Sequence, residues 1–224
     1  MIRPMSTYNQ IKDNEDCYLK SLFLSLKEVK GSYIRDNYHD PIVDFTYVER
    51  TFAYEFYYQW RHYLIKNKIE NVRIDAEIPK QFVDANHDAN SPYDTVYPDM
   101  VLHTGQSYPE GNIIACEFKR MINLSDSLIL KDLKKLQRYV NSESEVAQSA
   151  NWEPFQFGVF ILIFNNINKE SVENKLHTML SSLKEEITDQ IKNQDKIICC
   201  IYDGCDFYYD RLDKLIRDKE YLPI

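Results

Sequence analysis

Residues Tyr97–Arg120 have the sequence YPDMVLHTGQSYPEGNIIACEFKR. It contains two mainly apolar segments, YPDMVLH and NIIACEFKR, separated by a loop that holds glycine and proline. Short apolar segments with turn-forming residues between them are typical of two strands joined by a loop. The stretch therefore predicts a pair of neighbouring strands at the centre of the fold.

The second segment places charged and apolar side chains on opposite faces of its strand. Side chains alternate along a strand, so Glu117 and Lys119 project from the same face. The opposite face carries the apolar side chains Ile114, Cys116 and Phe118. The neighbouring strand offers Asp99. Burying charged groups is costly unless they are paired or metal-bound, so this arrangement predicts a chemical role.

Pro98-Asp99 and Glu117-Phe118-Lys119 resemble the motif of the PD-(D/E)xK nuclease superfamily. The resemblance implies a restriction-endonuclease-like fold of class α/β: a central mixed β-sheet flanked by helices, with the core order α-β-β-β-α-β-α-β. It also implies a Mg²⁺ ion, or Mn²⁺ in its place, and hydrolysis of DNA phosphodiester bonds. The other elements of the chain have to support this identification.

Composition favours a soluble globular protein. A chain of 224 residues, 44% hydrophobic and 28% charged, can form one domain with a sizeable core. The apolar run Phe157–Phe164 is too short to span a membrane, and the N-terminus has no apolar signal-peptide region. Five cysteines without CxxC spacing predict reduced thiols and a cytoplasmic location. The net charge of −8 argues against a simple nucleic-acid coating protein, but it leaves a nuclease open because local fields matter more.

Two helices are expected before the motif, at about Asp13–Lys30 and Val43–Lys66. The second has a core-facing stripe formed by Phe45, Phe52, Ala53, Phe56, Trp60, Tyr63 and Leu64. Glu49 lies in the middle of this stripe, where a carboxylate needs a partner. The resemblance assigns Glu49 to the metal site. An ion pair with an arginine or a cap at the helix edge is the alternative, and Glu55, about 120° away, is the fallback.

The remaining elements predict a mixed sheet. We expect a half-buried strand at Asn71–Phe82 and a buried strand at each of Phe155–Phe164 and Lys196–Tyr202. Helices are expected at Ser125–Val140, with Ser125 as N-cap, at Asn168–Gln190, and at Asp206–Tyr221. Helical crossovers imply antiparallel pairing early and parallel pairing late. The resemblance covers about 43–202 of a single domain, 1–224, to which an N-terminal and a C-terminal helix are added.

The helix after the motif is rich in basic residues. Between 117 and 138 the basic side chains outnumber the acidic ones. Such a surface favours phosphate contacts, for which the candidates are Arg120, Lys131, Lys135 and Arg138. A solvated lysine face explains the same pattern equally well.

The resemblance also implies the role of each site residue. Asp99 and Glu117 would hold the metal with the Phe118 carbonyl, and Glu49 would join directly or through water. Lys119 would orient or deprotonate the attacking water and stabilise the transition state. Glu49, Asp99, Glu117 and Lys119 are thus the expected catalytic residues.

Three alternatives stay open. Lys119 could form a purely structural salt bridge with Glu117 or Asp99. The chain could also be an inactive nuclease-fold protein that binds nucleic acid or serves in an assembly. The paired carboxylates could also belong to another hydrolase, such as a glycosidase. The form of the substrate, a homodimer and a targeting partner protein are open as well.

Overall fold

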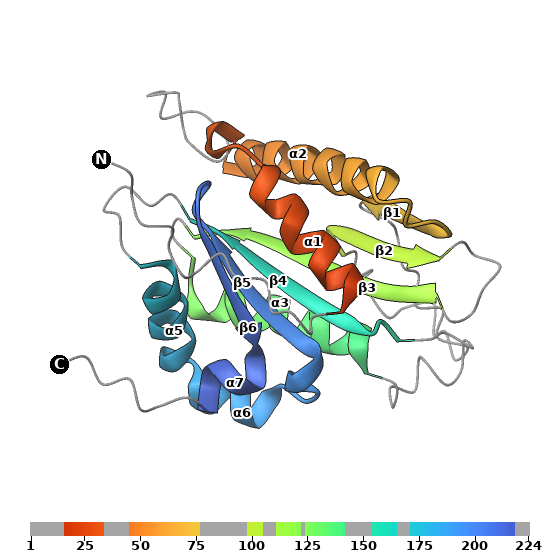
Figure 1. Cartoon of the computed structure of the whole chain (residues 1–224). Helices are drawn as coiled ribbons and strands as arrows, with labels where there is room; N and C mark the ends of the chain where they lie inside the picture. The colour runs from red at the N-terminus through yellow and green to blue at the C-terminus, as the bar shows by residue number, and fades with distance from the viewer. Residues whose placement is uncertain are drawn as a thin grey trace, which may run out of the picture.

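A mixed β-sheet runs through the middle of the molecule (Figure 1). The computed structural model describes residues 16–33, 45–76, 98–104, 111–121, 124–141, 154–164 and 171–217. Within them, six strands lie in the sheet in chain order: β1 (Val72–Ala76), β2 (Met100–Thr104), β3 (Asn112–Arg120), β4 (Phe157–Ile163), β5 (Ile197–Tyr202) and β6 (Phe207–Arg211).

Strand directions change along the sheet. The first three strands pair antiparallel, β3 to β5 pair parallel, and β6 returns antiparallel to β5. The early antiparallel and late parallel pairing is confirmed, because each parallel pair is joined through a helical connection. The expected α/β class with a mixed sheet flanked by helices is also confirmed.

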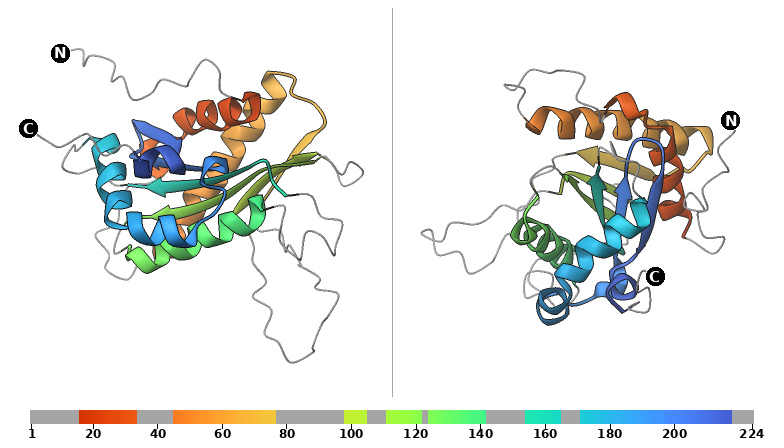
Figure 2. Two further views of the ribbon diagram at one scale, coloured as in Figure 1. Left: turned by 90° about the horizontal axis from the view of Figure 1, so that it is seen from below. Right: turned by 90° about the vertical axis from the view of Figure 1, so that its left-hand side faces the viewer.

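Helices cover both faces of the sheet (Figures 1 and 2). One face is covered by α1 (Cys17–Glu28) and α2 (Phe45–Lys66). The other is covered by α3 (Asp126–Val140), α5 (Val172–Ser182), α6 (Lys184–Gln190) and α7 (Leu212–Arg217). Single-turn 3₁₀ helices lie at Gly31–Tyr33 and Gln194–Lys196. Two apolar clusters, one on each face, form the core.

The aromatic stripe of α2 packs on the sheet as its spacing predicts. Phe52, Phe56 and Trp60 are fully buried. The rings of Phe52 and Phe56 meet Phe118 of β3 edge-on, at centroid distances of 5.5 and 5.8 Å. The indole of Trp60 donates a 2.9 Å hydrogen bond to Ser21 of α1. These contacts fix α2, and with it Glu49, over β3.

The expected helix at Asp206–Tyr221 is wrong in its first part, and 218–221 lie outside the described residues. Asp203 accepts bonds from the amides of Cys205 and Asp206, and Gly204 has a φ of 88°, which together make a tight turn. The chain then returns as β6, and only Leu212–Arg217 is helical. After the turn, alternate aromatic side chains project from one face of the chain and stack against α1, which favours a strand over a helix.

Smaller differences concern element ends. The helix expected at Asn168–Gln190 is divided at Leu183, whose ψ of 9° leaves helical geometry while its side chain stays buried. β1 ends at Ala76, which is exposed, and 77–82 lie outside the described residues. Ser125 occupies the N-cap of α3, but its hydroxyl contacts Ser127 and makes no capping bond. None of the helices in the described ranges has the length and hydropathy that a membrane crossing requires.

Candidate active site

The site forms where β3 extends beyond its neighbour β2. β2 begins at Met100, which pairs with Cys116, whereas β3 continues beside β4 as far as Arg120. Alternate amides of a strand face the same edge, so those of Phe118 and Arg120 face the side that β2 leaves open. Two carboxylates accept hydrogen bonds from these amides in place of a neighbouring strand.

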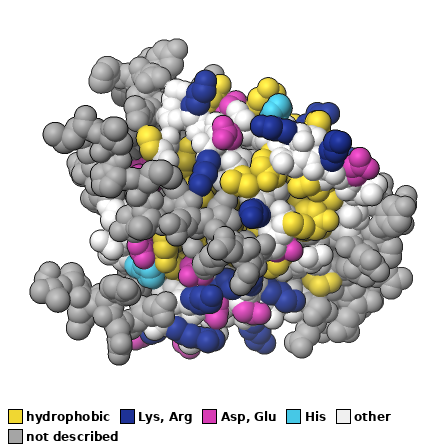
Figure 3. All heavy atoms as spheres, viewed as in Figure 1, with side chains coloured by type: hydrophobic (Ala, Val, Ile, Leu, Met, Phe, Trp, Pro, Cys, Tyr) yellow, Lys and Arg dark blue, Asp and Glu magenta, His cyan; other side chains and the backbone are white. Residues whose placement is uncertain are grey.

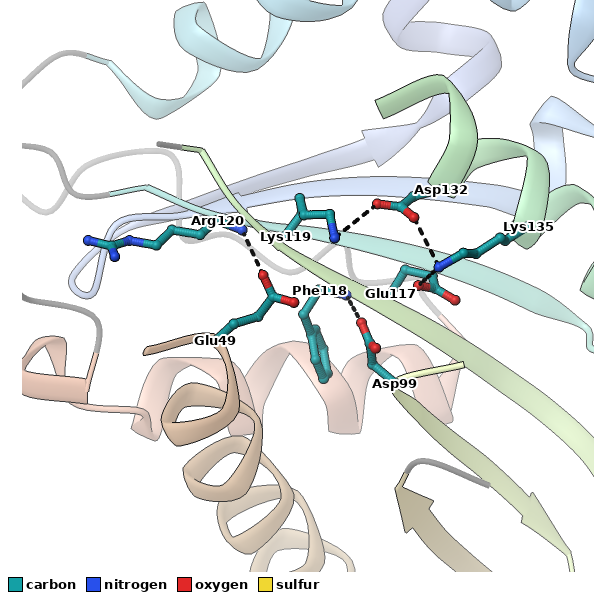
Figure 4. Close-up of polar contacts among 8 residues, drawn as sticks. All are labelled: Glu49, Asp99, Glu117, Phe118, Lys119, Arg120, Asp132 and Lys135. Atoms are coloured by element: carbon teal, nitrogen blue, oxygen red, sulfur yellow. Dashed lines mark hydrogen bonds and ion pairs between the residues drawn. The ribbon is translucent and has the colours of Figure 1, made fainter. Parts of the chain in front are cut away.

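Asp99 and Glu49 bind this open edge of β3 (Figure 4). The Phe118 amide donates to Asp99 Oδ2 at 2.7 Å, and the Arg120 amide donates to Glu49 Oε2 at 3.4 Å. Side chains from the start of β2 and from α2 therefore meet on one strand edge. The alternative of Glu49 as a helix-edge acid paired with an arginine side chain is replaced by this backbone contact.

Glu117 lies on the α3 side of β3 and is only 2% exposed. Its Oε2 accepts a 3.1 Å bond from Lys135 Nζ, while its Oε1 is buried and has no hydrogen-bond partner among the described residues. Burial, followed by the negative charge of Asp99, raises the pKa of Glu117 to about 8. The carboxylate is thus under-satisfied: it lacks a second positive or hydrogen-bonding partner.

Lys119 and Lys135 share one acid of α3. Asp132 is 3% exposed; its Oδ2 lies 3.5 Å from Lys119 Nζ and its Oδ1 lies 3.1 Å from Lys135 Nζ. Together with the contact between Lys135 and Glu117, this makes a chain of alternating charges across β3 and α3 (Figure 4). The alternative reading, a structural salt bridge of Lys119 with Glu117 or Asp99, is not what the structure shows, because Lys119 pairs with Asp132.

Gly158 of β4 allows α3 to approach closely enough for this chain of charges. A Cβ atom at Gly158 would lie 3.2 Å from Leu136 Cβ and 3.3 Å from Val140 Cγ1. These distances are tighter than normal packing, so a side chain here would push α3 outward. Asp132 and Lys135, on the same helix, depend on this close approach.

Glu49, Asp99 and Glu117 all have raised pKa values, mainly because their carboxyl groups are buried. Burial, with a further contribution from the charge of Glu49, raises the pKa of Asp99 to about 6 even though the Phe118 amide opposes the shift. Burial also raises the pKa of Glu49, against the opposing charge of Lys119. A bound cation would stabilise the ionised forms of such carboxylates, because its positive charge offsets the repulsion between them.

A cleft of about 370 Å³ opens onto Asp99, Glu49 and the edge of β3. Its other wall is formed by Arg50, Ala53 and Tyr54 of α2. The carboxylates are therefore accessible to a small ion and to part of a larger ligand, although Glu117 itself is buried.

A hard divalent cation is compatible with the donor set. In the described part of the chain, no three Asp, Glu, His or Cys side chains are arranged as a metal site. The carboxylates instead bind the Phe118 amide and Lys135. Mg²⁺ often takes only one or two protein carboxylates and fills its remaining positions with water and phosphate oxygens. Asp99 and the unpartnered Oε1 of Glu117 meet that requirement.

The sequence-predicted residues divide into those gathered at the site and those away from it. Glu49, Asp99, Glu117 and Lys119 come together, and the Phe118 amide binds Asp99 among them. The fallback Glu55 instead accepts a 2.7 Å bond from Gln59 of its own helix.

The four phosphate candidates are placed differently from one another. Lys131 and Arg138 are exposed on α3. Lys135 turns inward to Glu117 and Asp132, and Arg120 is buried, with its guanidinium extending away from the carboxylates (Figure 4). The exposed pair therefore fits a phosphate-contact role better than the inward pair.

Asp132 is the site residue that the motif did not identify. The available signal was an acid next to the apolar stripe of α3, beside Ile129 and Leu133. The same signal had identified Glu49 on α2.

Comparison of the chain with protein-family models, with curated proteins and with solved structures found no match in any of the three. Function therefore has to be argued from the site itself.

Proposed function

We propose that this protein is a Mg²⁺-dependent nuclease that hydrolyses DNA phosphodiester bonds on a restriction-endonuclease-like core. The observation that carries the proposal is the convergence of Asp99, Glu117 and Glu49 around the edge of β3, with Lys119 next to them. The order α2-β1-β2-β3-α3-β4-α5/α6-β5 supports it, since it follows the core order of that superfamily.

The carboxylates would hold the metal. Asp99 and Glu117 are the proposed ligands, with the Phe118 carbonyl, and Glu49 would bind directly or through water; Mn²⁺ suits the same oxygens. When bound, the ion supplies Lewis acidity toward a phosphate oxygen. The raised pKa values of Asp99, about 6, and Glu117, about 8, favour this role, because cation binding would stabilise their ionised forms.

Lys119 would act on the attacking water and on the charge of the phosphate. Its ammonium group is about a quarter exposed and lies 3.5 Å from Asp132, which limits its freedom. A lysine held beside the scissile phosphate can orient the water and stabilise the negative transition state. Asp132 is then a positioning residue, because it acts through Lys119.

Lys135 would serve as the positive partner of Glu117 before a metal binds. Its own burial lowers its pKa, but the charges of Glu117 and Asp132 outweigh this and raise it. The ammonium group therefore stays charged beside Glu117 and offsets part of the cost of burying that carboxylate.

The test is a cleavage assay on supercoiled plasmid, linear duplex and single-stranded DNA with Mg²⁺ or Mn²⁺. Wild type is expected to cut at least one of these, and Asp99→Ala and Lys119→Ala are expected to lose activity. Glu55→Gln is a matched control on α2. It should retain activity, because Glu55 bonds Gln59 of its own helix. Absence of cleavage by wild type, or equal cleavage by the two site variants, contradicts the proposal.

One observation favours a second candidate, a nuclease-fold protein that binds nucleic acid or serves in an assembly without cutting. Asp99 and Glu49 cap the open amides of β3, which is a structural task by itself. Calorimetric titration with Mg²⁺ distinguishes the two: the nuclease binds the ion and cuts DNA, whereas the second candidate leaves DNA intact.

A further inference from the structure

A groove leads away from the carboxylates between α2 and β1. The cleft at Asp99 includes Arg50 and Tyr54 of α2 and Ala76 of β1. A second cleft, of about 390 Å³, continues along the same two elements and includes Tyr57 and Arg61 of α2. We call these two clefts together the α2–β1 groove.

The α2 residues of both clefts lie on one side of the helix. At 100° per residue, positions 49 to 65 that line the clefts fall within about 160° of one another. At 1.5 Å per residue this side is about 24 Å long, which corresponds to at most about seven nucleotides at 3.4 Å each. The groove therefore has the length of a short nucleic-acid segment and begins at the proposed cleavage site.

The helix side along the groove combines exposed aromatic and basic side chains. Tyr54, which lines the first cleft, is 67% exposed, and Tyr58, one turn further along α2 and just outside the lining residues, is 60% exposed. Arg50 and Arg61 are also exposed and lie within one turn of these tyrosines. Figure 3 shows basic and hydrophobic side chains, with some acidic ones among them, along the upper part of the molecule. The Tyr58 ring stacks on His62 at a centroid distance of 6.2 Å, so both tyrosines present a ring toward solvent on this part of α2.

Beyond the acidic residues Glu49 and Asp99 at its start, the groove is lined by more basic than acidic side chains, although the chain as a whole is acidic. Arg50 and Arg61 contribute positive charge, and the acid of the second cleft, Asp75, is neutralised by Arg73 at 2.6 Å and held by His103 at 2.8 Å. Glu55 faces another side of α2. A polyanion leaving the carboxylate site would follow this side of the helix.

We infer that the α2–β1 groove binds a single-stranded segment of DNA. Arg50 and Arg61 contact its phosphates, and Tyr54 and Tyr58 stack on unpaired bases. Single strands are favoured over duplexes because the faces of paired bases are already stacked on each other and are closed to a tyrosine ring. This inference deepens the proposed function, since it places the substrate strand relative to the carboxylates.

Fluorescence anisotropy tests the groove with a fluorescein-labelled 12-mer of thymidylate in EDTA, where no cleavage occurs. Wild type should bind the single strand more tightly than a 12-base-pair duplex, and raising the salt should weaken binding. The double variant Tyr54→Ala/Tyr58→Ala should bind at least fivefold more weakly, since stacking contributes about 1–3 kcal/mol per base. Tyr54→Phe/Tyr58→Phe should keep the affinity, because the rings remain.

Charge variants complete the test. Arg61→Ala should weaken binding and lower the salt slope by about one. Arg217→Ala removes one positive charge on the other face of the sheet, where Arg217 pairs with Asp213, and should have no effect. Equal affinity for duplex and single strand, or wild-type affinity in Tyr54→Ala/Tyr58→Ala, overturns the inference. Failure of the nuclease proposal looks different: the single strand binds through the groove but stays intact in Mg²⁺.

Discussion

Replacing Glu117 by glutamine should stabilise the protein at pH 7 in the absence of metal while removing a ligand of the proposed metal site. The folded-state pKa of Glu117 is about 8, against an ordinary value of 4.5. Between these values the unfolded chain releases the proton while the folded protein keeps it. Stability from this group is therefore complete below pH 4.5 and is lost as pH rises toward 8. Glutamine does not titrate, so the variant does not lose this stability as the pH rises.

The size of the effect follows from the pH interval. From 4.5 to pH 7 the penalty grows by about 1.4 kcal/mol per unit, which gives about 3 kcal/mol. The amide oxygen of glutamine can still accept a hydrogen bond from Lys135, so the 3.1 Å hydrogen bond is retained. For a chain of this size, 3 kcal/mol corresponds to a rise in melting temperature of about 6–12 °C.

Thermal unfolding of wild type and Glu117→Gln, at pH 5 and pH 7 in EDTA, measures this difference. The gain should be large at pH 7 and below about 1 kcal/mol at pH 5. Added Mg²⁺ should raise the melting temperature of wild type alone. Glu55→Gln, on another side of α2, should show no such pH-dependent gain. A variant less stable than wild type at pH 7 would refute the reasoning and would identify Glu117 as a structural ion-pair partner.

Two further substitutions test how α3 serves the site. Gly158→Ala should destabilise the fold by about 1–3 kcal/mol in urea unfolding, because the new methyl group meets Leu136 at 3.2 Å; wild-type stability would contradict the close packing. Asp132→Asn should slow DNA cleavage about 10- to 100-fold by releasing Lys119, 3.5 Å away, and should shift the pH profile of the rate; an unchanged rate and profile would show that Asp132 does not position Lys119.

Periodicity within a single helix or strand was sufficient to predict the features that depend on that element alone. The alternation in 112–120 predicted β3 at its observed bounds, and the 3.6-residue period of α2 predicted the burial of Phe52 and Trp60. The same stripe identified Glu49, because an acid among buried aromatic residues stands out in sequence. Asp99, Glu117 and Lys119 were singled out by the motif within 97–120 instead.

Features that depend on distant partners were not predictable in this way. Residues 207–211 carry aromatic side chains that a helix could also use, and pairing with β5 after the turn at Gly204 makes them a strand. Lys135 reads as part of a solvated basic face, yet it turns inward because Glu117, 18 residues earlier, lies beneath it. Asp132 becomes part of the site only through its two lysine contacts.

The rate at which the purified protein nicks supercoiled plasmid, measured as Mg²⁺ concentration rises, tests the central claim most directly. We predict a rate that saturates with Mg²⁺, is abolished by EDTA, and falls about 10²-fold or more in Lys119→Ala. A plasmid that stays supercoiled at every Mg²⁺ concentration, or a rate unaffected by EDTA and by Lys119→Ala, would contradict it.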